Sequence, residues 1–160
     1  MGWETILTNA NVDNYSHSHT YDLGDFTELG AVSGELLTIA EGNIEGSTFG
    51  LYSIYYLHQD GTWKQSNATT DGSGAKSLIG LAVTSTILLI SGYCTINLVA
   101  GLAGSPLYLN TSNGSVTVTA PYEAANSVRI IGYLLGGGED YSIIRFNPDS
   151  VWLELSVNGA

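Results

Sequence analysis

Apolar and polar side chains alternate most clearly between residues 104 and 155. Residues 107–110 (LYLN) and 116–119 (VTVT) each place leucine or valine at every second position. This period of two is typical of β-strands with one face in the core and the other in water. Between the two runs, Asn113-Gly114 accepts the positive φ angles of a tight hairpin turn. The runs VRIIGYLLGGG (128–138) and YSIIRFNPDSVWLEL (141–155) predict further strands.

The earlier part of the chain carries shorter runs of the same kind. Two of them flank Gln59-Asp60-Gly61, which is a second hairpin signal. Residues 1 to about 25 are polar and acidic without sustained periodicity. They predict an extended arm or an irregular segment, with an ordered strand of the domain itself as the alternative. The strands predicted in this part are residues 34–40, 50–58, 62–66, 78–83, 87–90 and 92–99.

The stretch from residue 77 to 103 is uncharged, and it is apolar enough to resemble a membrane span. Its Thr, Ser and Gly content, its Ile and Val residues and the lack of a flanking positive cluster favour consecutive buried strands instead. All runs together indicate about eight to ten short strands. The sequence thus predicts an all-β protein, with a compact β-sandwich or barrel-like domain over residues 26–160 and an N-terminal arm over residues 1–25.

Charge excludes several kinds of partner. The 160 residues carry fifteen acids against four Lys and Arg residues, a formal net charge of −11. Such a charge repels phosphate backbones and anionic lipids, so we expect no nucleic-acid binding and no membrane docking, whereas a basic protein surface would suit it. The N-terminus lacks a secretory signal, so we expect synthesis in the cytoplasm. Cys94 lies in an apolar run and is expected to be a buried, unreactive thiol.

His17 and His19 have the one spacing that suits a metal ion. Two imidazoles at i and i+2 of an extended segment point to the same side, and a trimer would gather three such pairs around its axis. A polar loop that happens to contain two histidines is the alternative, and we predict no metal site. Nearby acids lack the spacing of a calcium loop and are expected to be solvated: Asp13, Asp22, Asp25 and Glu28.

No catalytic constellation is recognisable. The sequence has no nucleophile elbow and no phosphate-binding loop, since Gly136–Gly138 precedes a strand and predicts a hairpin tip. A glycan-active enzyme would need two carboxylates about 5 to 10 Å apart across a cleft. No such pair is evident, although Asp60 and Asp149 are acids that mutation can test. We therefore predict no enzyme, no cofactor and no catalytic, cofactor-binding or metal residues.

Aromatic residues within the strand runs have two interpretations. The first is packing in the core or between subunits, and the second is a platform for sugar binding. The residues concerned are Trp63, Tyr108, Tyr133 and Trp152.

The order of several motifs is more specific than any one of them. A strand leads to Asp60-Gly61-Thr62-Trp63, and the following motifs are AKSLIGLA (75–82), ILLISGYCTI (87–96), SPLYL (105–109), a glycine hairpin, Ala120-Pro121, VRIIGY (128–133) and FNPDSVWLE (146–154). Over about residues 50 to 155, this succession resembles an all-β module of virion structural proteins of tailed bacteriophages. That module is found in tail fibres and in capsid decoration (cement) proteins.

The resemblance implies a non-enzymatic structural protein that forms trimers or other symmetric assemblies. Tail-fibre versions follow a long repetitive shaft, and this sequence contains none. We therefore expect a homo-oligomer, with a trimer favoured, that binds the major capsid protein or another virion protein and stabilises the shell. Its expected place is the virion, at the capsid surface rather than the tail, after synthesis in the host cytoplasm. A tail-fibre or receptor-binding module that recognises host surface glycans is the alternative.

Overall fold

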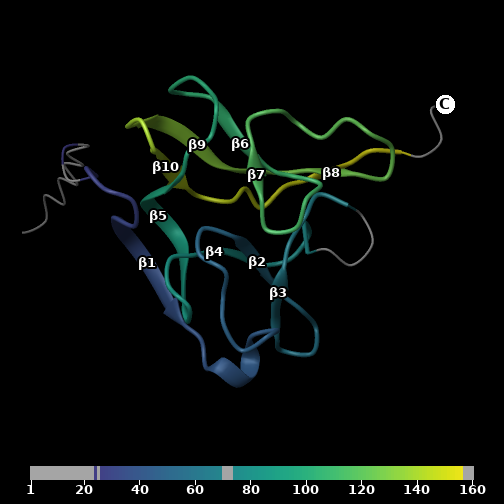
Figure 1. Cartoon of the computed structure of the whole chain (residues 1–160). Helices are drawn as coiled ribbons and strands as arrows, with labels where there is room; N and C mark the ends of the chain where they lie inside the picture. Colours follow the sequence, from purple (N-terminus) through teal and green to yellow (C-terminus); the bar gives the residue numbers. More distant parts are fainter. Residues whose placement is uncertain (1–23, 25, 70–73, 157–160) are drawn as a thin grey trace, which may run out of the picture.

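The computed structural model describes residues 24, 26–69 and 74–156. Within these ranges the chain forms eleven β-strands and a 3-10 helix, η3 (Glu41–Asn43) (Figure 1). The strands are β1 (Val32–Thr38), β2 (Ile54–Leu57), β3 (Trp63–Gln65), β4 (Ile79–Ala82), β5 (Ile87–Asn97), β6 (Pro106–Leu109), β7 (Val116–Thr117), β8 (Ser127–Val128), β9 (Ile130–Gly137), β10 (Tyr141–Phe146) and β11 (Leu153–Glu154). The predicted all-β class is confirmed. The described strands exceed the predicted eight to ten because the two-residue strands β8 and β11 are separate from β9 and β10, which the runs 128–138 and 141–155 had included with them.

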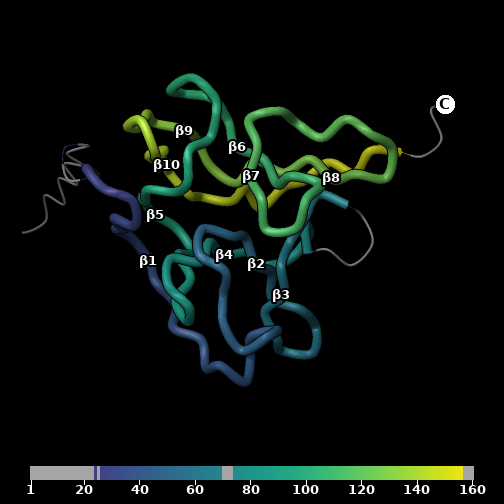
Figure 2. Tube along the Cα trace, viewed as in Figure 1, coloured from purple at the N-terminus to yellow at the C-terminus, as the bar shows by residue number. Residues whose placement is uncertain are grey.

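Most of the described strands belong to one antiparallel sheet. Its order is β3-β2-β4-β5-β10-β9-β6-β7, and β1 pairs with β5 beside this path. The sheet curls into a half-barrel, and β8 and β11 form a separate two-stranded sheet. Figure 2 shows β1 to β4 gathered on one side of the molecule and β6 to β10 on the other, with β5 between them.

β5 joins the two halves because it is long enough to pair with strands of both. One of its edges pairs with β4 near the start of the strand and with β10 from Gly92 onward. The opposite edge pairs with β1. The two strands predicted at 87–90 and 92–99 are therefore one continuous strand, since Gly92 extends it with a φ angle of 152°.

The core consists of two apolar clusters, one on each face of the β2–β4 region. In β2, Ile54 and Tyr56 belong to the larger cluster, whereas Tyr55 between them belongs to the second with Phe49 and Trp63. This alternation is the two-residue period of a strand that is buried on both faces. The larger cluster also takes residues from both halves of the sheet, among them Leu81, Leu107, Ile131 and Phe146. Its burial therefore holds the halves together.

The predicted hairpin at Asn113-Gly114 forms between β6 and β7, but its tip docks on β2 and β3 instead of extending into solvent. The Gly114 amide donates to the Ser66 carbonyl at 2.7 Å, and the Ile54 amide donates to the Gly114 carbonyl at 2.9 Å. Gly114 has a φ of 69°, and a Cβ added there would lie 2.9 Å from the Ser53 Cβ. Only glycine suits a turn that is both left-handed and so closely packed.

The apolar stretch from residue 77 to 103 forms β4, β5 and the turns around them. Across the residues that the structure describes, no helix has the length and apolar character needed to cross a membrane. Apart from Gly24, the predicted N-terminal arm over residues 1–25 lies outside the described residues, so that prediction stays a prediction.

Candidate functional site

β1 is an exposed strand at the edge of the sheet. Val32 is half-buried, and the residues from Ser33 to Thr38 are all exposed. Within the described ranges β5 is its one strand neighbour, so the second edge of β1 has no strand paired to it. Figure 1 shows β1 at the outside of the molecule beside β5. A free edge of this kind offers backbone N–H and C=O groups to a strand of another chain.

Two glycines let β1 approach β5 closely. Gly34 lies opposite Gly92, and their φ angles are 148° and 152°. A Cβ added to Gly34 would lie 2.2 Å from the Ser91 carbonyl oxygen, and one added to Gly92 would lie 2.2 Å from that of Ser33. Both contacts are with backbone atoms that cannot rotate away. The position of the edge strand therefore depends on this glycine pair.

Two leucines of β1 face solvent. Leu36 is 47% exposed and Leu37 is 39% exposed. Because consecutive side chains of a strand point to opposite faces, both faces of this part of β1 are apolar and uncovered. A register shift between Glu35 and Leu36 bends the ladder with β5 just before them. We call the free edge of β1 with these two leucines the β1 edge.

The β1 edge lies in an acidic part of the chain. Residues 26–45 contain no lysine or arginine, and their acids are all exposed: Glu28, Glu35, Glu41 and Glu45. Two copies of this edge would bring like charges together, which is unfavourable across paired strands. A basic surface of a different chain would match both the charge and the free edge.

A second apolar surface lies at the end of the described chain. Val151, Trp152 and Leu153 are three successive exposed apolar residues, which we call the C-terminal strip. Leu153 belongs to β11, which pairs with β8. Lys76 Nζ lies 2.6 Å from Glu154 Oε2 and ties the strip to the body of the protein. Trp152 thus lies at the surface rather than in the core.

Asp60 stabilises the turn between β2 and β3. Its Oδ1 accepts hydrogen bonds from the Thr62 hydroxyl at 2.6 Å and the Thr62 amide at 2.9 Å. His58 Nδ1 lies 2.9 Å from Oδ1, and Lys64 Nζ lies 3.3 Å from Oδ2. These partners, Thr62 above all, hold the pKa of Asp60 well below its ordinary value. Such a carboxylate stays ionised at neutral pH and cannot serve as a general acid.

Asp60→Ala is expected to destabilise the protein at neutral pH and much less in acid. Because the pKa of Asp60 is lower in the folded state, the ionised carboxylate stabilises the fold above the unfolded-state pKa of about 3.9. That contribution is lost as the pH falls through the folded-state pKa. In urea denaturation, the gap between the midpoints of wild type and variant should narrow below about pH 4. A gap that stays constant down to about pH 2 would contradict this account.

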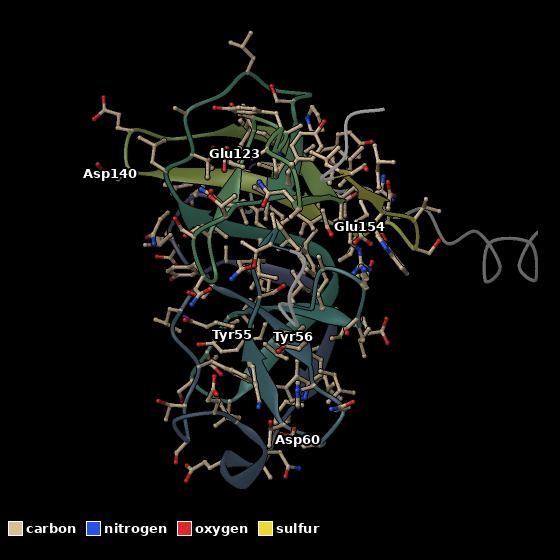
Figure 3. All side chains as sticks on the ribbon, turned by 90° about the vertical axis from the view of Figure 1, so that its right-hand side faces the viewer. Tyr55, Tyr56, Asp60, Glu123, Asp140 and Glu154 are labelled. Atoms are coloured by element: carbon tan, nitrogen blue, oxygen red, sulfur yellow. The ribbon has the colours of Figure 1, made fainter. Side chains whose placement is uncertain are left out.

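The acids that Figure 3 labels do not face one another across a cleft. Asp60 lies at one end of the molecule, and Glu123, Asp140 and Glu154 lie apart from one another toward the other end (Figure 3). Asp149 has partners of its own, since its backbone carbonyl accepts a hydrogen bond from Arg129 Nε at 2.7 Å. Asp60 and Asp149, the two acids considered for mutation in the sequence analysis, thus have different partners. Asp60 contacts residues of its own turn, and the Asp149 backbone contacts Arg129.

Arg129 is a buried cation that the sequence pattern does not reveal. Its side chain donates through Nε to the Asp149 carbonyl and through Nη1 to the carbonyls of Ala75, at 2.9 Å, and Ser77, at 2.6 Å. Arg129 is 7% exposed, and its burial lowers the pKa of the guanidinium while the charge of Asp149 opposes that shift. One side chain therefore joins two loops to the start of β9. An arginine beside valine and isoleucine in a strand run otherwise indicates a solvent-facing position.

Metal binding gains no support from the described residues. Among them, no group of three or more His, Cys, Asp or Glu side chains could hold a metal ion. Glu28 is exposed, and its backbone carbonyl accepts a hydrogen bond from the Thr95 hydroxyl. The other residues considered for a metal or calcium site lie outside the described ranges: His17, His19, Asp13, Asp22 and Asp25.

Cys94 is buried, as its place in an apolar run predicts. Burial raises the pKa of its thiol to about 12. A thiol with so high a pKa is almost entirely protonated at neutral pH and is a poor nucleophile. Cys94 is therefore a core residue of β5.

Comparisons with protein-family models, with curated proteins and with solved structures find no match to this chain. Functional inference therefore depends on the geometry described above and on the order of motifs in the sequence. The features that need an explanation are the β1 edge and the C-terminal strip, which are uncovered apolar surfaces.

Proposed function

We propose that the protein is a structural protein of a bacteriophage virion, a capsid decoration protein that binds the shell through the β1 edge. The observation that supports this most strongly is a seven-residue edge strand with two exposed leucines and no strand on its second side in the described chain. Proteins that act as monomers avoid such edges, because free edges pair with other chains. The order of motifs over residues 50 to 155 supports the phage context. The proposed role involves no catalysis.

Binding at the β1 edge would stabilise a shell by mass action. A protein that binds only the assembled lattice adds its binding free energy to the assembled state. A partner strand paired with β1 would contribute main-chain hydrogen bonds, and burial of Leu36 and Leu37 would add about 25 cal/mol per Å² of apolar area. The surrounding glutamates favour a basic partner surface. We propose the major capsid protein, or another virion protein, as the partner.

The C-terminal strip suits contact between copies of the protein. It is apolar, and its neighbouring Glu154 already pairs with Lys76, so a contact between copies would not leave that charge uncompensated. We propose a homo-oligomer, with a trimer favoured, that forms through this strip and leaves the β1 edges free for the shell.

The copy number of the protein in purified virions tests the proposal directly. Quantitative mass spectrometry would compare this polypeptide with the major capsid protein of the same particles. Hundreds of copies, in a simple ratio to the capsid protein, are the expected result. A few to a few tens of copies would place the protein in the tail, and complete absence from particles would overturn the virion assignment.

Replacing both Leu36 and Leu37 with lysine is expected to weaken binding to shells at least about tenfold, because a lost apolar contact of about 1.4 kcal/mol has this effect. Fold stability should change little, since both side chains are exposed. Co-sedimentation with shells that lack the protein measures the binding. Leu102→Lys is the matched control, because Leu102 is also exposed but lies outside β1. Equal binding by the double variant and the control would exclude the β1 edge as the docking surface.

The alternative, a tail-fibre module that recognises host surface glycans, is favoured by a different feature. A hollow beside the exposed Tyr122 has both polar and apolar walls, and it lies outside the β1 edge. A copy number typical of a tail component would support this second candidate over decoration.

A further inference from the structure

A surface hollow of about 220 Å³ lies between the β6–β7 hairpin and the loop that leads to β8. Its walls include Asn110, Thr117, Thr119, Tyr122, Glu123 and Asn126. The stretch from residue 110 to 126 supplies all of these side chains. The hollow takes no residue from β1 or from the C-terminal strip, so the proposed assembly role does not account for it.

Backbone contacts hold the far end of this stretch in place. Ala125 donates to the Leu155 carbonyl at 3.0 Å, and the Leu155 amide donates to the Asn126 carbonyl at 2.8 Å. The Ser127 amide donates to the Ala68 carbonyl at 2.6 Å. Ala125 itself has a φ of 67°, a left-handed conformation that side chains other than glycine rarely adopt. A hollow fixed by such contacts loses little conformational freedom when a ligand binds.

Asn126 lines the hollow, and its side-chain amide has an unused hydrogen-bonding group. Its side chain is 6% exposed, and its buried Nδ2 has no hydrogen-bond partner. Leaving a buried amide unpaired is unfavourable, and such groups are rare in folded proteins. Rotation of the amide by 180° exchanges Oδ1 and Nδ2, so the group can both accept from and donate to a ligand. Because Nδ2 has almost no exposed area, a ligand hydroxyl pairs with the amide once this side chain turns toward the hollow.

The rim of the hollow combines an apolar ring with polar groups. Tyr122 is 82% exposed, so most of its side chain is open for contact. Glu123 next to it is exposed and offers carboxylate oxygens, and Thr117 and Thr119 offer hydroxyls. Figure 3 shows Glu123 in the half of the molecule opposite Asp60. No lysine or arginine lines the hollow, and the chain carries a net charge of −11, so an anionic ligand is disfavoured.

We propose that this hollow binds one ring of a neutral sugar. A sugar ring presents an apolar C–H face to an aromatic ring such as that of Tyr122, and its hydroxyls donate to Glu123 and exchange hydrogen bonds with Asn126. The volume is below the range of sites for drug-sized molecules, which fits a single ring at the end of a glycan. This site is independent of the β1 edge, so the protein can carry it whether it sits on the shell or on the tail.

Protein-observed NMR titration with individual neutral sugars tests the proposal. The probes are glucose, galactose, mannose, rhamnose and N-acetylglucosamine. At least one should give saturable shifts confined to residues 110–126 and their contacts, with a dissociation constant in the millimolar range. Tyr122→Ala should weaken that binding about tenfold by removing the ring, and Glu123→Gln should weaken it about threefold. Leu102→Ala is the control, because Leu102 is an exposed apolar residue outside the hollow.

Three results would overturn the proposal. The first is no saturable shift with any of the five sugars. The second is binding that survives both Tyr122→Ala and Glu123→Gln while thermal melting shows the variants to be folded. The third is preferential binding of choline or of N-acetylneuraminate, which would change the ligand class to a cation or an anion. Shell binding by the β1 edge is measured separately, so failure here leaves the decoration role unaffected.

Discussion

Replacing Arg129 with methionine is expected to lower the free energy of unfolding by about 3 kcal/mol, because three backbone carbonyls lose their donor and each unsatisfied group costs about 1–3 kcal/mol. The three acceptors belong to Ala75, Ser77 and Asp149. Methionine keeps much of the side-chain volume, so the loss reports on hydrogen bonds more than on packing. Urea denaturation followed by circular dichroism measures the difference.

Two further variants separate the role of Arg129 from a general effect of charge removal. Arg145→Met removes the charge of an exposed arginine of β10 and should change stability by no more than about 0.5 kcal/mol. Arg129→Lys keeps the charge but lacks the planar fork that reaches several acceptors at once, so its stability should fall between those of wild type and Arg129→Met. Equal stability of Arg129→Met and Arg145→Met would show that the buried contacts contribute nothing.

Replacing Gly92 with alanine is expected to destabilise the fold by more than about 2 kcal/mol, because a strained backbone conformation alone costs about 1–3 kcal/mol. The added Cβ would also lie 2.2 Å from the Ser33 carbonyl oxygen and 2.7 Å from the Gly34 Cα. Neither backbone can move without breaking the β1–β5 ladder. Hydrogen exchange should therefore accelerate at the amides of β1 that donate to β5, before it does so in β9 and β10.

Gly42→Ala is the control for the Gly92 variant. A Cβ at Gly42 would meet no atom within 4 Å, so stability should stay within about 0.5 kcal/mol of wild type. Unchanged exchange in β1 of the Gly92→Ala variant would contradict the close pairing of the two glycines. If decoration depends on the β1 edge, Gly92→Ala should also weaken shell binding under conditions in which the rest of the protein is folded.

The local alternation of apolar and polar residues predicted the longer strands and the faces of their side chains well. The hairpin turns at Asn113-Gly114 and at Asp60-Gly61 both form, because each needs only the conformation of a few neighbouring residues. The same is true of burial along β2, where the alternation of side chains directly assigns each residue to a face. The alternation over residues 116–119 also predicted β7, although only Val116 and Thr117 form the strand. The two-residue strands β8 and β11 were not separated from the longer runs 128–138 and 141–155, since so short a segment shows no period.

The sequence by itself therefore determined the all-β class, the position of the longer strands, the tight turns and the burial of Cys94. Each of these depends on side chains close together along the chain. Tertiary structure alone decided that β5 has partners on both edges, that β1 has no second strand neighbour among the described residues, and that Arg129 is buried among carbonyls. The hollow at Asn126 also exists only after folding, because distant segments hold its loop in place. Those features depend on contacts between residues that are far apart in the sequence. The local alternation of apolar and polar side chains does not predict such contacts.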